Sequence, residues 1–244
     1  MSRGSLSVNF GPEEKSVLAY GILSYKNNNS SYATKHDIFI DRDGQPSFLA
    51  GVPLDHSTLT ALVRDFSNNA QVGSFLPETV LSAGMSFLVW WVKPAKREIH
   101  FACDGEEGIG RESAIVPHPG LIFAVNEESW YVFAVKGTTR PKATTPLFQA
   151  PHFNVSETGR ICTGNVTIPS GDFSVESMAA WEKAYFGSRF SHPNVPKLVK
   201  YEGGSYPFWR SMLDNKFSKF PNEVLVQGDM VAGDLVTMMN GGKR

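Results

Sequence analysis

The sequence predicts an α+β protein in which an antiparallel β-meander with flanking helices follows a small α/β N-terminal extension. The meander is predicted from four apolar segments rich in β-branched and aromatic residues, separated by polar links too short for parallel crossovers. These segments are Met85–Val92, Glu98–Cys103, Leu121–Val125 and Trp130–Val135. Helical spacing of apolar residues before and after them predicts the helices. No repeat or heptad pattern is visible, so the chain forms a simple succession of elements.

The N-terminal extension begins with two predicted strands. Val17–Tyr25 and His36–Ile40 are rich in β-branched and aromatic residues, and the turn signal Asp41–Gly44 follows the second. This pattern is typical of a hairpin. We expect the extension to cover residues 1–74 and a second domain to cover residues 75–244.

A helix is predicted to follow this hairpin. Its N-cap is Asp55 or Ser57, and Asn68-Asn69 are expected to end it. Four apolar residues fall at positions i, i+3, i+4 and i+7 and so share one helical face: Leu59, Leu62, Val63 and Phe66.

The region after the meander predicts a loop and then a helix. Thr138–Pro146 is rich in Pro and Thr, which predicts no regular pairing, and it leads into a loop that carries Cys162. Ser174–Phe190 predicts a helix with apolar residues at helical spacing: Val175, Met178, Trp181 and Tyr185. Val224–Val226 is a strand candidate, and Met239–Arg244 predicts a frayed end.

Charge and hydropathy argue against nucleic acid and membrane as partners. The 23 Lys+Arg nearly balance the 24 Asp+Glu, giving a formal net charge of -1, with no long basic run. The longest apolar stretch, Phe87–Val92, is far shorter than the roughly 20 residues that a membrane span needs. The first residues lack the apolar core of a signal peptide, so we expect a cytoplasmic location.

The two cysteines of the chain lead to different expectations. Cys103 closes an apolar strand, which favours a buried structural thiol. His100 and Cys103 together suggest zinc, with His118, His152 and Cys162 available to complete a site. Because no second close-spaced ligand pair exists, we expect no metal.

The segment from His152 to Cys162, HFNVSETGRIC, carries the strongest chemical signal. Cys162 follows His152 by ten residues, with an apolar Val155, a turn glycine at Gly159 and Ile161 before the cysteine. This segment resembles the active-site loop of ubiquitin-conjugating enzymes, where a His-Pro-Asn tripeptide precedes an apolar residue, a turn with Gly, an Ile and the catalytic Cys. The predicted order of meander, proline-containing passage, loop and helices also resembles the fold of that family, which implies a UBC-like domain.

Two departures from the eukaryotic pattern indicate a bacterial branch. Phe153 stands at the Pro position of the tripeptide, and Thr163-Gly164 replaces the Leu-Asp common after the nucleophile. In length, in the passage from Trp130 to Cys162 and in the Trp-rich strand before it, the chain is most similar to the PRTRC system protein B family. This resemblance implies a plasmid-borne cassette with a ThiF-like activating enzyme and a ubiquitin-like protein as partners, beside a ParB-related protein.

The resemblance implies a role for each matched residue. Cys162 would accept the modifier as a thioester and pass it to an amine, which requires a reachable thiolate. Asn154 corresponds to an Asn that either donates to the developing oxyanion or stabilises the turn. His152 is expected to hold the loop. Asp172 is not part of the matched motif, and its position in the Ser170-Gly-Asp turn after the loop makes it a candidate to orient the incoming amine. Because no glycine-rich phosphate loop precedes a helix, we expect no cofactor, and ATP-dependent activation would fall to the partner.

Two other functions remain open. A non-catalytic interaction module of the same fold would bind the modifier or its activating enzyme. Phe153 and Thr163-Gly164 favour this alternative, and an unreactive, buried Cys162 would confirm it. A cysteine hydrolase would need a His-Asp/Asn pair brought to the thiol, with an imidazole other than His152 near it. The tripeptide His192-Pro193-Asn194 repeats the family triplet, but Glu202 rather than Cys stands ten residues on, so we interpret it as a turn after the helix.

Overall fold

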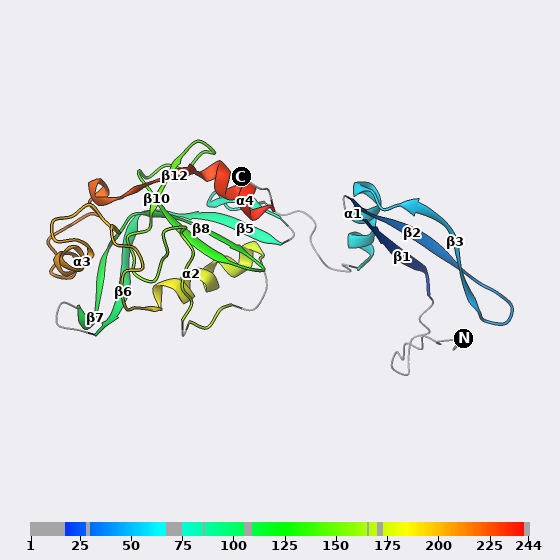
Figure 1. The fold of residues 1–244 in the computed structure, drawn as a ribbon, viewed down its shortest axis with the longest axis horizontal. Coiled ribbons are helices and arrows are strands. Elements are labelled where there is room, and N and C mark those ends of the chain that lie inside the picture. Colours follow the sequence, from blue (N-terminus) through cyan, green and yellow to red (C-terminus); the bar gives the residue numbers. More distant parts are fainter. Residues whose placement is uncertain are drawn as a thin grey trace. The chain divides into compact units, whose positions relative to one another are not determined.

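The computed structural model describes residues 18–27, 30–66, 75–84, 86–104, 109–164, 166–169 and 173–241, without the side chains of residues 63–66. The chain forms two compact units, Met1–Ser74 and Phe75–Arg244 (Figure 1). Together the two units make the mixed α+β class that the sequence predicts.

The first unit is a three-stranded antiparallel sheet followed by a helix. The order is β1-β2-β3, with β1 at Tyr20–Lys26, β2 at Ser31–Ile40 and β3 at Pro46–Pro53. The third strand is an addition to the predicted hairpin. Its eight residues are all exposed, so no alternation of buried and exposed positions marks it in the sequence.

Helix α1 spans His56–Phe66, and its N-cap is Asp55 rather than Ser57. The Thr58 amide donates to Asp55 Oδ1 at 2.8 Å, and this hydrogen bond is the main reason that the pKa of Asp55 falls to about 2. Leu62 is buried on the predicted face, whereas Leu59 is exposed. Asn68 and Asn69 lie outside the described residues.

The second unit is built on a six-stranded antiparallel sheet in the order β12-β10-β9-β8-β5-β4. The strands are β4 Val80–Ala83, β5 Phe87–Val92, β8 Gly120–Asn126, β9 Trp130–Val135, β10 Pro146–Gln149 and β12 Gln227–Val231. Three of these match predicted segments, whereas β4, β10 and β12 do not. Pro146 pairs with Val231, so the prediction that pairing stops through Pro146 is wrong at that residue.

The predicted meander is wrong in one respect, because β6 leaves the main sheet. β6, Ala95–Cys103, pairs antiparallel with β7, Gly110–His118, and parallel with β11, Arg189–Phe190. Nine residue pairs join β6 to β7. β5 pairs instead with β8, and both strands are almost wholly buried because alternate residues face the two cores on opposite sides of the sheet.

Helices cover both faces of the main sheet (Figure 1). α2, Met178–Phe186, follows the 3₁₀ turn Val175–Ser177 and packs Trp181 and Tyr185 into the larger core. α4, Ala232–Met239, packs on the opposite face, against β5 and β8. The predicted helix to Phe190 is therefore too long, because its last residues form β11. α4 is missing from the predictions, and the strand expected at Val224–Val226 begins only at Gln227.

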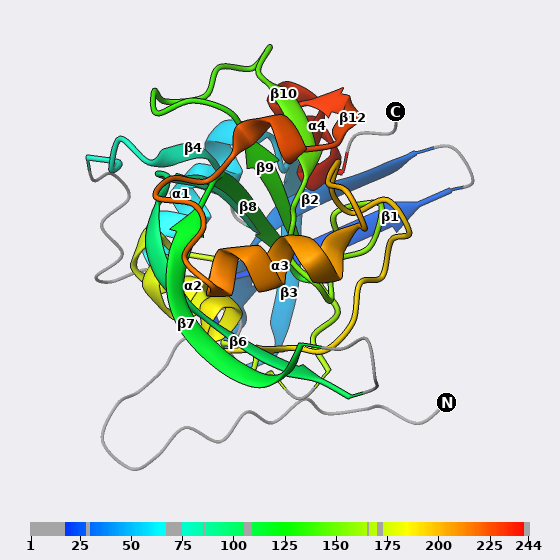
Figure 2. The same cartoon turned by 90° about the vertical axis from the view of Figure 1, so that its left-hand side faces the viewer.

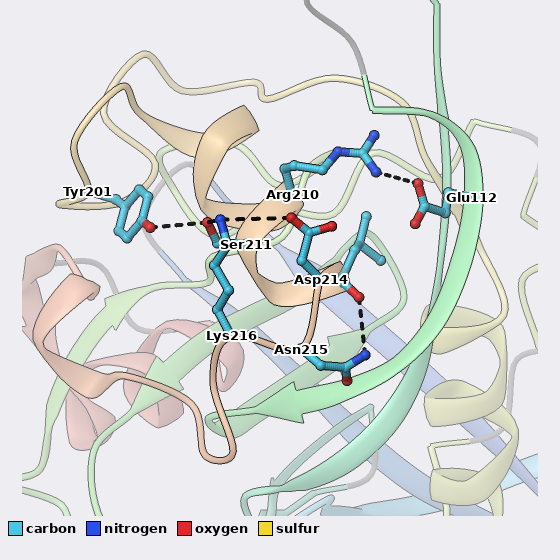
Figure 3. Close-up of polar contacts among 8 residues, drawn as sticks. Glu112, Tyr201, Arg210, Ser211, Asp214, Asn215 and Lys216 are labelled. Atoms are coloured by element: carbon cyan, nitrogen blue, oxygen red, sulfur yellow. Dashed lines mark hydrogen bonds and ion pairs between the residues drawn. The ribbon is translucent and has the colours of Figure 1, made fainter.

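The β6–β7 hairpin curves past α2 and α3, Ser205–Leu213 (Figure 2). Arg210 of α3 pairs with Glu112 of β7 through Nη1 (Figure 3). It also donates from Nη2 to the Ile109 carbonyl at 2.8 Å. Ser211 of α3 accepts a hydrogen bond from Tyr201 at 3.1 Å. These contacts fix α3 beside the hairpin, and so fix the core under the predicted active loop, since Trp209 lies on the same helix.

Among the described residues, no helix is both long and apolar enough to cross a membrane.

Candidate active site

The loop from Asn154 to Cys162 is a closed structure joined to the main sheet. The Cys162 amide donates to the Asn154 carbonyl at 2.8 Å, and Val155 pairs with Ile161 as an isolated bridge. The Ile161 amide donates to the Trp130 carbonyl at 2.9 Å, so the loop extends the sheet beside the first residues of β9, where β10 does not reach. The backbone that carries Cys162 is thus fixed by the sheet.

The surroundings of Gly159 and Phe153 explain why these two residue types stand at their positions. Gly159 has a φ of +80°, and an added Cβ would lie 2.3 Å from the Phe133 ring, so only glycine fits. Phe153, at the position of the family's Pro, is fully buried and makes edge-to-face contacts with Phe101 and Tyr206. A large aromatic anchor therefore takes the place of a rigid proline.

Cys162 is exposed, whereas Cys103 is buried. Cys162 lines a pocket of about 1050 Å³ together with Asn154, Ser191 and His192, between the loop and the segment that follows α2. Cys103 donates from Sγ to the Phe190 carbonyl at 3.4 Å, and burial raises its pKa. Only Cys162 therefore has the accessibility that a nucleophile needs, and its exposure removes the observation that would have favoured a non-catalytic module.

Asn154 joins the loop to the segment after β11. It has a φ of +60°, in the left-handed region that Asn tolerates better than most residues. Its Oδ1 accepts from the Ser191 amide at 3.2 Å and from the Ser191 hydroxyl at 3.0 Å, and its Nδ2 donates to the Arg189 carbonyl at 2.9 Å. Its own amide donates to the His192 carbonyl at 3.1 Å. These contacts correspond to the turn-stabilising role.

His152 is fully buried and does not line the pocket of Cys162. Its Nε2 lies 2.9 Å from Nδ1 of His118, and the two rings stack. Burial, reinforced by the neighbouring His118 and Arg97, holds the pKa of His152 well below the usual value, and burial lowers that of His118 to about 3. Both imidazoles are therefore neutral, and His152 anchors the start of the loop in the core.

The sequence reasoning missed Ser191 and His192. His192 lines the pocket of Cys162, and its Nδ1 lies 2.9 Å from the Ser191 hydroxyl. Its tripeptide was interpreted only as a turn. The condition set for the hydrolase alternative is also met in part, because an imidazole other than His152 shares the pocket. Asp172 lies outside the described residues.

Within the described part of the chain, no three His, Cys, Asp or Glu side chains come together as a metal site. The ring of His100 is hydrogen-bonded to the Ser113 hydroxyl at 2.8 Å, and the rings of His118 and His152 are hydrogen-bonded to each other. The five residues considered as zinc ligands therefore do not come together in one place: His100, Cys103, His118, His152 and Cys162.

Comparison with known proteins identifies a family for most of the chain. Residues 56–228 match the model of a family described as Prokaryotic E2 family D. No curated protein and no solved structure matches the chain. The matched region contains α1 of the first unit and reaches Gly228 in β12, so it includes the whole Cys162 loop and the segment around His192.

Proposed function

The chain belongs to Prokaryotic E2 family D, and on this premise we propose that Cys162 accepts a ubiquitin-like modifier as a thioester and passes it to an amine. The observation that carries the proposal is the exposed Cys162 on a loop joined to the sheet on one side and to Ser191 on the other. A nucleophile of this kind must be reachable, and its backbone must be held in place.

The donor in this proposal is a ThiF-like activating enzyme carrying the modifier on its own cysteine. We also propose that the chain belongs to the PRTRC system protein B family. Three features of the sequence support this: its length, the passage from Trp130 to Cys162 and the Trp-rich strand. Activation with ATP then belongs to the partner. Residues 75–244 would carry the conjugating activity, with residues 1–74 as an N-terminal extension that contributes α1 to the family region.

The acceptance step exchanges one thioester for another. The Cys162 thiolate attacks the carbonyl carbon of the modifier's C-terminal glycine. A C–S bond forms at Cys162 Sγ, the bond to the partner's sulfur breaks, and the partner's cysteine leaves as a thiolate that takes up the proton released by Cys162.

Asn154 has two functions in this scheme. Three carboxamide contacts hold the loop against Ser191 and Arg189. One Nδ2 hydrogen is used on the Arg189 carbonyl, and the carboxamide has a second, which can stabilise the oxyanion that develops at the thioester carbonyl. His152 holds the loop from the core and does not exchange a proton.

The test mixes the protein with a ThiF-like enzyme, its ubiquitin-like protein and ATP, and looks for an adduct on non-reducing gels. An adduct cleaved by thiols, abolished in Cys162→Ala and thiol-resistant in Cys162→Ser supports the proposal. Cys103→Ala serves as the matched control and should still form the adduct. If the modifier is activated but no adduct forms, the protein is a non-catalytic binding module.

A second candidate function, hydrolysis of a modifier thioester, is favoured by one observation: an imidazole shares the pocket with Cys162. Cysteine hydrolases use such a pair to transfer an acyl group to water. The two functions separate in one assay, in which charged protein is incubated with and without an added amine. Loss of the thioester that does not depend on the amine would indicate the hydrolase.

A further inference from the structure

A chain of hydrogen bonds determines which nitrogen of His192 carries a proton. The Arg189 carbonyl can only accept and the Ser191 amide can only donate, so Asn154 must present Nδ2 to the first and Oδ1 to the second. Oδ1 therefore also accepts the single hydrogen of the Ser191 hydroxyl. With that hydrogen used, the hydroxyl can only accept from Nδ1 of His192 at 2.9 Å. The neutral ring thus has its proton on Nδ1 and a lone pair on Nε2.

Apart from His192, the pocket of Cys162 offers few groups that can act as a base. Besides the thiol, the charged and titratable side chains among its described lining residues are Lys183, Arg189 and His192, and no carboxylate is among them. Two cations disfavour the protonated form of an incoming amine, so they increase the fraction that can act as a nucleophile. The attacking amine still has to lose a proton, and His192 is the only described lining residue suited to accept it.

We propose that Nε2 of His192 is the base that takes the proton from the acceptor amine as it attacks the thioester on Cys162. This inference rests on the proposed function. The amine nitrogen forms a bond to the carbonyl carbon, the bond from that carbon to Cys162 Sγ breaks, and Cys162 leaves as a thiolate. The N–H proton goes to Nε2, and the imidazolium then returns it to the thiolate, which restores the free enzyme.

Ser191 is a positioning residue in this step. Its hydroxyl connects Asn154 to His192, so it fixes the tautomer and the ring orientation without touching the amine. Asn154, which holds the loop that carries Cys162, therefore also orients His192 through the hydroxyl group of Ser191.

The experiment measures loading and discharge separately. Protein charged on Cys162 is first quantified on non-reducing gels, then mixed with excess lysine, and the single-turnover loss of thioester is followed. His192→Gln should load as the natural protein does and discharge at least about 100-fold more slowly, the range for loss of a general base. His100→Gln is the matched control, because His100 is also bonded to a serine hydroxyl but does not line the pocket.

The pH dependence distinguishes a base from a structural residue. Protonation of lysine affects both proteins equally, so the ratio of their discharge rates isolates the imidazole. Because a protonated imidazole cannot accept the amine proton, this ratio should be smaller in acid than in mild alkali. Added imidazole should restore discharge to His192→Ala, and Ser191→Ala should slow discharge severalfold while keeping the pH dependence.

The two proposals fail in different ways. If the natural protein never loads, the proposed function is wrong. If it loads and His192→Gln discharges at the same rate, or at a reduced rate with a pH-independent ratio and no rescue by imidazole, His192 is not the base.

Discussion

The amide of Cys162 donates a hydrogen bond to the carbonyl of Asn154 at 2.8 Å, which closes the loop between them. Asn154 is held in turn by β11 and the residues that follow it, and Ile161 by β9. The exposed thiol therefore lies on a backbone that is fixed from two sides. Substitutions at Asn154 or in the turn at Gly159 should displace Cys162 through the backbone.

Asn154→Ala should lower the free energy of unfolding by about 1–3 kcal/mol, because it leaves the Ser191 amide and the Arg189 carbonyl without their partner. Asn215→Ala is the matched control. Asn215 also has a left-handed φ, of +59°, but its Nδ2 makes a single long contact of 3.4 Å to the Leu213 carbonyl. Urea unfolding of both variants measures the difference, and equal losses would contradict the loop-holding role.

Gly159→Ala should be more destabilising than Gly110→Ala. Both glycines have a φ of +80°, so the backbone strain is matched. Only at Gly159 would the new Cβ meet a ring, at 2.3 Å from Phe133, whereas nothing lies within 4 Å at Gly110. We expect an additional loss of about 1–3 kcal/mol in the free energy of unfolding, the usual range for overpacking. A difference below the error of the urea titrations would show that the Phe133 ring moves aside at no cost.

The elements that the sequence predicts correctly are those whose pattern is local. β5, β8 and β9 are continuous apolar runs, and α1 has an N-cap directly before an amphipathic face. β7 is missing from the predictions because its first half is partly exposed and polar, and its pairing depends on β6. β11 has two residues, and only its parallel pairing with β6 makes it a strand.

The candidate site follows the same division. The spacing from His152 to Cys162 is local, and it is enough to indicate the loop, the turn glycine and the candidate nucleophile. The burial of His152 depends on His118, 34 residues away, and the contacts of Asn154 depend on Ser191, 37 residues away. The sequence contains a signal for His192, the His-Pro-Asn at residues 192–194, but the contacts that bring it to the loop are long-range: the parallel pairing of β11 with β6 and the bond from the Asn154 amide to the His192 carbonyl.

The two cysteines should differ strongly in reactivity. Cys162 is exposed, whereas Cys103 is buried, is bonded to the Phe190 carbonyl and has a pKa raised by burial. Under limiting iodoacetamide at neutral pH, we expect alkylation of Cys162 at least about tenfold faster than alkylation of Cys103. Peptide mass spectrometry over time measures both rates in one sample, and unfolding in urea should remove the difference. Comparable rates in the folded protein would contradict the assignment of Cys103 as a structural thiol.

The buried pair of His118 and His152 should make the protein less stable in mild acid. Their folded-state pKa values lie below that of histidine in the unfolded chain, about 6.5, with His118 at about 3. Their contribution is therefore fully present above about pH 6.5 and is lost as the pH falls toward the folded values, because the unfolded chain takes up protons that the core does not.

Each of these histidines should contribute a slope that approaches ~1.4 kcal/mol per pH unit below about pH 6, so the pair gives about twice that. Urea titrations between about pH 8 and about pH 5 measure it, and His118→Gln, which removes one titrating ring, should reduce the slope by about half. Burial raises the pKa of Glu182, so this residue contributes to the pH slope of stability with the opposite sign. Measuring Glu182→Gln both alone and combined with His118→Gln removes that contribution from the comparison. A slope unchanged by His118→Gln would show that the acid sensitivity arises outside the pair, and that His152 is not held neutral by its place in the core.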